Sequence, residues 1–266
     1  MRLIILLLLM SSCITNLNAQ VPDPLSSQQI LGYPKDLWGL TKAPAYWGKK
    51  EWGRSLIAGA VIYGAFTLDQ DIHSWVLNKP FSGYSADFLT ASRHWGDGLF
   101  SLPVFAGLYC WGRIADNQKH QLVAMNATKA FVLSRLLVQL PKFLFQRHPP
   151  SKDNSADHLL FDGPLGAGTN RSFSSGHVIS IFSAAEVFRS SYDDWWVGAV
   201  AYSIAGTVGF QRLSSGSHWF SDVTTSAIWG VAIGHWIVKK GETRLSLLTG
   251  SAPNSSTQTV GLLLRF

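Results

Sequence analysis

The feature that most constrains this chain is a series of apolar segments that contain no charged residue. They span residues 55–68, 98–112, 195–211 and 223–238, and glycine and alanine recur inside them. Small residues of this kind suit helices that pack closely against one another. None of the segments reaches the 18 or so residues expected of a membrane span. The pattern therefore predicts a bundle of helices.

Two further segments carry charges in their middle and complete a set of six expected helices. The expected helices are 55–68, 99–111, 123–145, 178–189, 195–210 and 222–238. Helices joined by short connections are typical of an all-α bundle. The one long connection, residues 148–173, is polar and rich in Gly, Pro, Asp and Ser. A loop of that length inside a compact domain is usually functional.

The first nineteen residues are expected to be a signal peptide. A short basic start is followed by apolar residues 3–10 and by small or polar residues 11–19, which is the layout of a secretory signal. Cleavage is expected after Ala19. Cys13 leaves lipidation open as an alternative, because the residues before it loosely resemble a lipoprotein cleavage box.

The tail of the chain is expected to form a β-hairpin. Apolar residues alternate with period two on either side of a polar segment, a pattern typical of two strands joined by a turn. The alternating residues are Leu245, Leu247, Val260, Leu262, Leu264 and Phe266. The expected division is a signal peptide at 1–19, an irregular N-terminal arm at 20–53, a helical domain at 54–240 and a hairpin tail at 241–266.

The net charge of +6 and its distribution along the chain limit the kinds of molecule that the chain is expected to bind. Basic residues are scattered and no run exceeds two, whereas a nucleic-acid binder concentrates them in a patch or stripe. We therefore expect no nucleic-acid partner, and we expect an anionic substrate or an acidic lipid surface. Removal of the signal would leave Cys110 alone, which excludes an intrachain disulfide and a metal site built on cysteine.

Two locations remain open from the sequence. In an up-and-down bundle, a set of basic residues would fall at one end, which the positive-inside rule would place in the cytoplasm. The set is Lys49, Lys50, Arg54, Arg113, Lys119, Arg189, Lys239 and Lys240. An export signal would instead carry residues 20–53, at that same end, out of the cytoplasm. A bundle that folds in the periplasm or cell envelope and associates with a membrane surface avoids this conflict. A multi-pass membrane protein is the alternative.

Three clusters of polar residues fall at one end of the expected bundle. In chain order they are Lys142 and Arg147; Ser174, Ser175, Gly176 and His177; and Arg212, His218 and Asp222. The third and fifth helices end where the fourth and sixth begin, so an up-and-down topology brings the clusters together. Taken singly, each cluster could be a helix cap or a solvated helix end. Their joint occurrence indicates a site.

The residue types suit the binding of an oxyanion such as phosphate. Lys142, Arg147 and Arg212 supply positively charged donors. Gly176 lets the backbone approach an anion closely at a helix N-terminus, and Ser175 adds a hydroxyl group.

The same clusters contain candidates for catalysis. His218 and Asp222 are four residues apart and therefore share one helix face. The carboxylate can hold one imidazole nitrogen and leave the other available for nucleophilic attack. His177 is available as a general acid.

Together these residues resemble the motifs of the type-2 phosphatidic acid phosphatase / vanadium-dependent haloperoxidase superfamily. That family has a Lys…Arg-Pro motif, a Pro-Ser-Gly-His motif and a Ser-Arg…His…Asp motif. Their counterparts in this sequence are "KFLFQRHPP" (142–150), "SSGH" (174–177) and "QRLSSGSHWFSD" (211–222). The third segment has the family's spacing, and the resemblance covers about residues 55–240.

The resemblance implies a phosphoric monoester hydrolase with a helical bundle of the phosphatidic acid phosphatase kind. The substrate would be a phosphate monoester or a lipid phosphate, hydrolysed without a metal through a phosphohistidine. His218 would be the nucleophile, Asp222 would orient it and His177 would protonate the leaving oxygen. The residues that would hold the phosphate are Lys142, Ser175, Gly176 and Arg212. No cofactor is expected, and vanadate would act as an inhibitor.

One departure from the family pattern leaves alternatives open. Pro149 stands where the family's first arginine is expected, seven residues after Lys142. Arg147 lies two positions earlier, and Arg171 is another possible substitute. The chain could accordingly be a degenerate, weakly active or non-catalytic member that binds phosphate headgroups. A haloperoxidase that takes vanadate as its cofactor is the other alternative.

Overall fold

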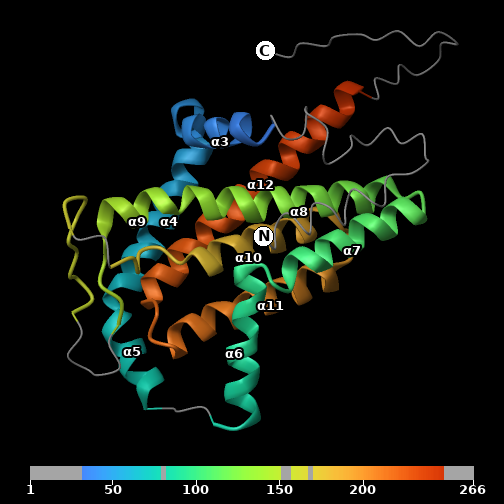
Figure 1. Ribbon diagram of the computed structural model, residues 1–266. Helices are drawn as coiled ribbons and strands as arrows, with labels where there is room; N and C mark the ends of the chain where they lie inside the picture. The colour runs from blue at the N-terminus through green and yellow to red at the C-terminus, as the bar shows by residue number, and fades with distance from the viewer. Residues whose placement is uncertain (1–31, 79–81, 151–156, 167–169, 249–266) are drawn as a thin grey trace, which may run out of the picture.

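The computed structural model describes residues 32–78, 82–150, 157–166 and 170–248, and within these ranges the chain is all-α (Figure 1). The helices are α3 (Gly32–Lys42), α4 (Lys49–Thr67), α5 (Asp69–Leu77), α6 (Tyr84–Asp97), α7 (Ser101–Ile114), α8 (Gln118–Leu137), α9 (Gln139–Phe145), α10 (Gly176–Ser191), α11 (Trp195–Ser214) and α12 (Phe220–Leu248), with a short 3-10 turn at Ala43–Tyr46. The expected helical fold class is confirmed.

Helix α10 is the centre of the bundle. It packs against α8, α11 and α12 (Figure 1). Its sequence is apolar or small around most of its circumference, and most of its residues are buried. A helix of that composition is stable only when other helices surround it. This arrangement holds the N-terminus of α10 in place between the ends of its neighbours.

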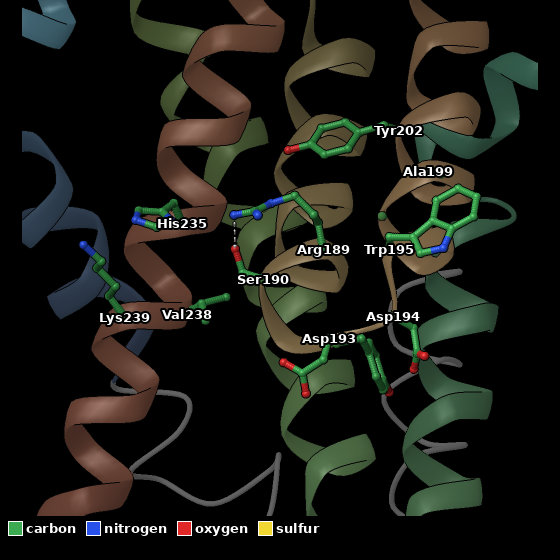
Figure 2. A pocket seen from close by; sticks show the side chains of 12 residues that line it. Arg189, Ser190, Asp193, Asp194, Trp195, Ala199, Tyr202, His235, Val238 and Lys239 are labelled. Atoms are coloured by element: carbon green, nitrogen blue, oxygen red, sulfur yellow. Dashed lines mark hydrogen bonds between the residues drawn. The ribbon is translucent and has the colours of Figure 1, made fainter.

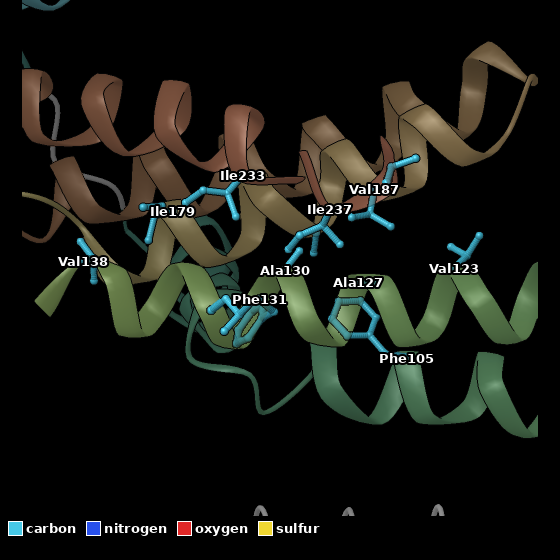
Figure 3. Close-up of a cluster of buried hydrophobic side chains, with 13 residues drawn as sticks. Phe105, Val123, Ala127, Ala130, Phe131, Val138, Ile179, Val187, Ile233 and Ile237 are labelled. Carbon is cyan, nitrogen blue, oxygen red and sulfur yellow. The ribbon is translucent and has the colours of Figure 1, made fainter. Parts of the chain in front are cut away.

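The main hydrophobic core joins α7, α8, α10 and α12. Figure 3 shows Phe105 of α7 and Phe131 of α8 on one side, with Ile179 of α10 and Ile233 of α12 facing them. The rings of Phe105 and Phe131 meet edge to face with centroids 6.2 Å apart, a favourable aromatic geometry.

Glycine allows α12 to approach α10 more closely than larger residues would. A Cβ atom added at Gly230 would lie 2.7 Å from the carbonyl oxygen of Ile179, and one added at Gly234 would collide with the carbonyl oxygen of Ser183. The backbones of α10 and α12 are therefore in direct contact along this stretch.

The six expected helices correspond to α4, α7, the pair α8 and α9, α10, α11 and α12. The expected helix 123–145 is interrupted at Val138. Pro141 explains the break, because proline cannot donate to the carbonyl four residues earlier and its ring clashes with that carbonyl. Helices α5 and α6 were not expected, because they are short and their many polar residues leave no clear apolar face in the sequence.

The N-terminal arm is more ordered than the sequence suggested. It contains α3, whereas an irregular arm with one short helical turn was expected, and α4 begins within it at Lys49. Asp36 of α3 is 2.9 Å from Lys129 of α8 and 2.6 Å from Lys240 of α12. These ion pairs, together with apolar packing onto the core, dock α3 on the bundle.

The C-terminal prediction is only partly within the described residues. Helix α12 continues to Leu248, so the backbone is helical at positions 245 and 247, where the first hairpin strand was expected. The rest of the expected hairpin, the signal peptide and Cys13 lie outside the described residues. Within the described ranges, no helix combines the length and the apolar content that crossing a bilayer requires.

Candidate active site

The predicted clusters meet in a cavity of about 530 Å³ at one end of the bundle. It lies where α9 and the long connection approach the N-terminus of α10 and the junction of α11 with α12. Five predicted site residues line it, namely Lys142, Gly176, His177, Arg212 and His218. Ser175, Asp222 and Arg147 are fully buried and lie outside the lining of this cavity.

The start of α10 presents a helix N-terminus to the cavity. Ser175 is the N-cap residue in an extended conformation, and Gly176 is the first helical residue. The Ser175 amide donates to Ser226 Oγ at 2.7 Å, while its own Oγ has no hydrogen-bond partner among the described residues. Backbone amides at a helix N-terminus favour an anion, so the position predicted for phosphate is electrostatically suitable.

His218 is held by a backbone carbonyl. Its Nδ1 lies 2.7 Å from the carbonyl oxygen of Ser172, which can only accept a hydrogen bond. The proton is therefore on Nδ1, and Nε2 carries the lone pair. Burial lowers the pKa of His218, and the positive charges of Lys142 and Arg212 act in the same direction. A neutral imidazole with an available Nε2 is the form that a nucleophile requires.

Asp222 stands behind this histidine. Its Oδ2 is 3.8 Å from His218 Nδ1, so the direct hydrogen bond expected between the two is replaced by the bond to Ser172. Asp222 Oδ2 instead accepts from Ser172 Oγ and from the Trp219 amide at 2.9 Å. Burial opposes ionisation of Asp222, but His218 and Arg147 outweigh it and lower the pKa of this carboxyl group. Asp222 thus acts on the imidazole by charge.

The structure corrects the expectation for Arg147. Its side chain is fully buried and lies between two carboxylates. Nη1 donates to Asp222 Oδ1 at 2.5 Å and to Ser221 Oγ at 2.7 Å, and Nη2 donates to Asp69 Oδ2 at 2.7 Å. Nε and Nη2 also donate to the carbonyl of His158. A guanidinium group with these partners does not line the cavity in which Lys142 and Arg212 lie.

Other cations occupy the cavity instead. Arg135 and Arg171 line it with Lys142 and Arg212, as does Pro149. Arg171 is the alternative that the sequence offered for the missing arginine. Arg135 was missed, because a charge inside an expected helix gives no signal of its own. The Arg135 guanidinium donates to the carbonyl of Gly96 in α6 at 3.0 Å and to the carbonyl of Gly176 at 3.4 Å, which places it beside the N-terminus of α10.

Lys142 is positioned by the long connection. Its Nζ donates to the carbonyl oxygen of Arg171 at 2.5 Å. Burial lowers the pKa of Lys142 to about 8, and neighbouring Arg135 and Arg171 also favour the neutral form. The ammonium group is consequently charged at neutral pH and loses its charge in mildly alkaline solution.

His177 lies among these cations. Burial lowers its pKa to about 3, with further contributions from Arg212 and Arg135. In the free site its imidazole is therefore neutral at pH 7. A bound dianion would offset the surrounding positive charge and raise this pKa, because an opposite charge favours the protonated form.

A second and larger cavity, of about 680 Å³, lies at the other end of α10 and contains no motif residue. Figure 2 shows Arg189 and Ser190 of α10 between His235 of α12 and Trp195 of α11. The Arg189 guanidinium is paired with buried Glu186 at 2.9 Å. Among the described residues, no group of three or more His, Cys, Asp or Glu side chains is arranged to hold a metal ion.

The sequence model of the PAP2 superfamily matches residues 122–245, which contain all three motifs. The resemblance drawn from the motifs is thereby confirmed over this part of the chain.

Two solved structures and one curated protein are similar to the chain. The crystal structure of a transmembrane PAP2-type phosphatidylglycerolphosphate phosphatase from Bacillus subtilis matches 71% of this chain and 92% of its own, with 21% identity and a TM-score of 0.54. That likeness supports the fold. LpxE from Aquifex aeolicus matches 65% of this chain and 95% of its own, with 24% identity and a TM-score of 0.48.

The curated relative is a lipid A 1-phosphatase from Porphyromonas gingivalis. It is 33% identical over 79 residues, which are 28% of this chain and 18% of that protein. The match thus spans less than a fifth of the relative's length.

Proposed function

We propose that this chain is a lipid-phosphate phosphatase, a phosphoric monoester hydrolase that works through a phosphohistidine at His218. The observation that carries the proposal is the environment of His218. Its Nδ1–H is fixed by the Ser172 carbonyl, and the imidazole faces a cavity lined by one lysine and three arginines. The match of residues 122–245 to the PAP2 superfamily model and the similarity to a lipid A 1-phosphatase support the same class of reaction.

In the first step, the Nε2 lone pair attacks phosphorus and the bond from phosphorus to the leaving oxygen breaks. Lys142, Arg171 and Arg212, with the amides at the start of α10, balance the charge on the phosphoryl oxygens. The leaving alkoxide takes a proton from His177, and the imidazole of His218 becomes positively charged. The proton on His177 enters with the substrate, since a bound phosphate raises the pKa of that imidazole.

In the second step, water replaces the leaving alcohol. His177, now neutral, accepts a proton from the water as its oxygen attacks phosphorus. The N–P bond breaks, its electron pair returns to Nε2 of His218 and inorganic phosphate leaves. His177 is protonated again, and this proton leaves with the phosphate as the site returns to its free state. The two steps together consume one water molecule and release one alcohol and one phosphate.

The surroundings of the cavity favour a lipid substrate over a small ester. Exposed apolar side chains lie at the end of α8 and on α9, the helix that carries Lys142. They include Leu136, Leu140 and Phe143, each more than half exposed. An apolar surface beside a cationic cavity suits an acyl chain joined to a phosphate. We propose on this basis a location in the cell envelope at a membrane surface, where such a substrate is presented.

The proposed mechanism needs no metal or other cofactor, because the cavity's own cations and helix N-terminus balance the phosphate charge. Vanadate resembles phosphate in charge and geometry, so we expect it to inhibit competitively. Phosphate should protect against this inhibition. Inhibition by vanadate that is unaffected by phosphate would contradict a shared site.

The test is phosphate release from p-nitrophenyl phosphate and from a dispersed lipid phosphate. The native chain is compared with His218→Ala and with a control, His235→Ala, which removes a half-exposed histidine at the other end of the bundle. We expect activity in the native chain and the control and none in His218→Ala. Full activity in His218→Ala would overturn the mechanism. Folded native protein that is inactive on both substrates would favour a non-catalytic headgroup-binding protein.

A further inference from the structure

Asp69 connects α5 to the site from a distant part of the sequence. It is the first residue of α5 and is fully buried. Its Oδ1 accepts from the Ser221 amide at 2.7 Å, and its Oδ2 accepts from Ser221 Oγ at 2.6 Å and from Arg147 Nη2 at 2.7 Å. Ser221 lies in the first turn of α12 and directly precedes Asp222. Asp69 therefore caps the helix that carries Asp222.

The buried charges behind His218 do not cancel. Arg147 bridges Asp69 and Asp222, and all three side chains are fully buried. Asp222 with Arg147 alone would be a neutral pair. Adding Asp69 gives two carboxylates and one guanidinium, which carry one net negative charge. Burial raises the pKa of Asp69, while its bonds to Ser221 and Arg147 act in the opposite direction.

This charge lies where little water can screen it. Phe66, Phe161 and Trp219 surround the Arg147 guanidinium, whose central carbon is 4.6, 5.3 and 5.5 Å from their ring centroids. Electrostatic effects are stronger in such an environment than in water. On the cavity side, His218 faces the positive charges of Lys142 and Arg212.

The chemistry of the proposed function needs a negative charge at this position. When Nε2 of His218 bonds to phosphorus, the imidazole becomes positively charged. A neutral Asp222–Arg147 pair would give that charge little stabilisation. Asp222 can assist fully only if another group offsets Arg147.

We propose that Asp69 is a positioning residue for His218: it offsets Arg147, so that Asp222 acts on the imidazole as a full negative charge, and it fixes the start of α12. This inference rests on the proposed function, because it assigns Asp69 a part in stabilising the charged imidazole. It assigns Arg147 a part in the same unit, as the cation that holds both carboxylates in place.

The experiment compares Asp69→Asn with the double variant Asp69→Asn/Arg147→Gln. Asparagine keeps an oxygen for the Ser221 amide, but it removes the charge and the second oxygen, which accepts from Ser221 Oγ and Arg147. We expect kcat for p-nitrophenyl phosphate to fall about tenfold in Asp69→Asn, with KM changed less than twofold, as for a pKa shift of about one unit. The double variant again leaves one net negative charge, on Asp222, and we expect it to recover most of the lost kcat. A purely structural role predicts a further loss instead.

A matched control is Asp36→Asn, which removes another buried carboxylate paired with cations, remote from the cavity. Thermal unfolding of all variants separates loss of fold from loss of chemistry. We expect Asp36→Asn to lower the melting temperature without lowering kcat. An equal loss of kcat in Asp36→Asn, or an unchanged kcat in Asp69→Asn, would overturn the inference.

An NMR titration of the His218 imidazole gives a readout that needs no turnover. The groups that face this ring are Asp222 on one side and Lys142, Arg212 and His177 on the other. We expect the pKa of His218 to be about one unit lower in Asp69→Asn than in the native chain. An unchanged pKa would refute the role of Asp69. Because the titration is independent of activity, an inactive native protein would refute the proposed function without deciding this inference.

Discussion

Replacement of Arg171 by alanine tests whether the cavity supplies its own substitute for the arginine that Pro149 replaces. Arg171 lines the cavity and is exposed, and its carbonyl oxygen, which the substitution retains, accepts from Lys142. A hydrogen bond to a charged group contributes about 1.5–3 kcal/mol. Since the side chain is exposed, the lower end applies, and about 1.5 kcal/mol corresponds to about a tenfold loss of kcat/KM.

The assay is the initial rate of phosphate release from p-nitrophenyl phosphate over a range of concentrations. The control is Lys119→Ala, which removes one positive charge from the exposed far end of α8. We expect about a tenfold loss in Arg171→Ala, less than a twofold change in Lys119→Ala and equal melting temperatures. If Arg171→Ala retained the native kcat/KM, Arg171 would not contact the phosphate and the reasoning would fail.

Three further outcomes are expected. Because the pKa of Lys142 is lowered to about 8, its side chain is charged below that pH, and kcat/KM should fall as the pH rises through about 8. In the Lys142→Arg variant this fall should move to higher pH. A pH profile that does not move would exclude Lys142 as its cause. A Cβ at Gly96 would lie 2.7 Å from Cβ of His177, so Gly96→Ala should displace the start of α10 and lower kcat tenfold or more; an unchanged kcat would show that this contact does not fix His177. Gly234→Ala should lower the free energy of unfolding, measured in urea, by about 1–3 kcal/mol, because the added Cβ would collide with a carbonyl oxygen of α10. Gly107→Ala should leave the free energy of unfolding unchanged, because the space around Gly107 is open. Equal effects of the two substitutions would contradict the close approach of the helices.

Much of the helical framework could be predicted from the sequence. Long apolar segments free of charge, such as 195–211 and 223–238, fall within α11 and α12. Helices α5 and α6 could not be predicted in this way, since they are short and polar and are held by tertiary contacts. Asp69 is an example, because its hydrogen-bond partner Ser221 in α12 lies 152 residues further along the sequence.

The cavity was predictable where motif residues are adjacent to helix ends. Gly176, His177, Arg212 and His218 all meet there, as an up-and-down bundle requires. Arg147 could not be placed, because a basic residue near a motif can contact a phosphate or a buried carboxylate, and spacing does not distinguish these. The hydrogen-bond partner of His218 could not be predicted either, since the Ser172 carbonyl belongs to an irregular loop.

The central claim is that the reaction passes through a phosphohistidine at His218. The most direct measurement is to mix the native chain with ³²P-labelled substrate, quench within milliseconds in alkali, which preserves phosphohistidine, and map the labelled peptide. The account predicts label on His218 of the native chain and none on the His218→Ala variant. Active native protein that turns over substrate without any label on His218, or with label on another residue, would contradict it.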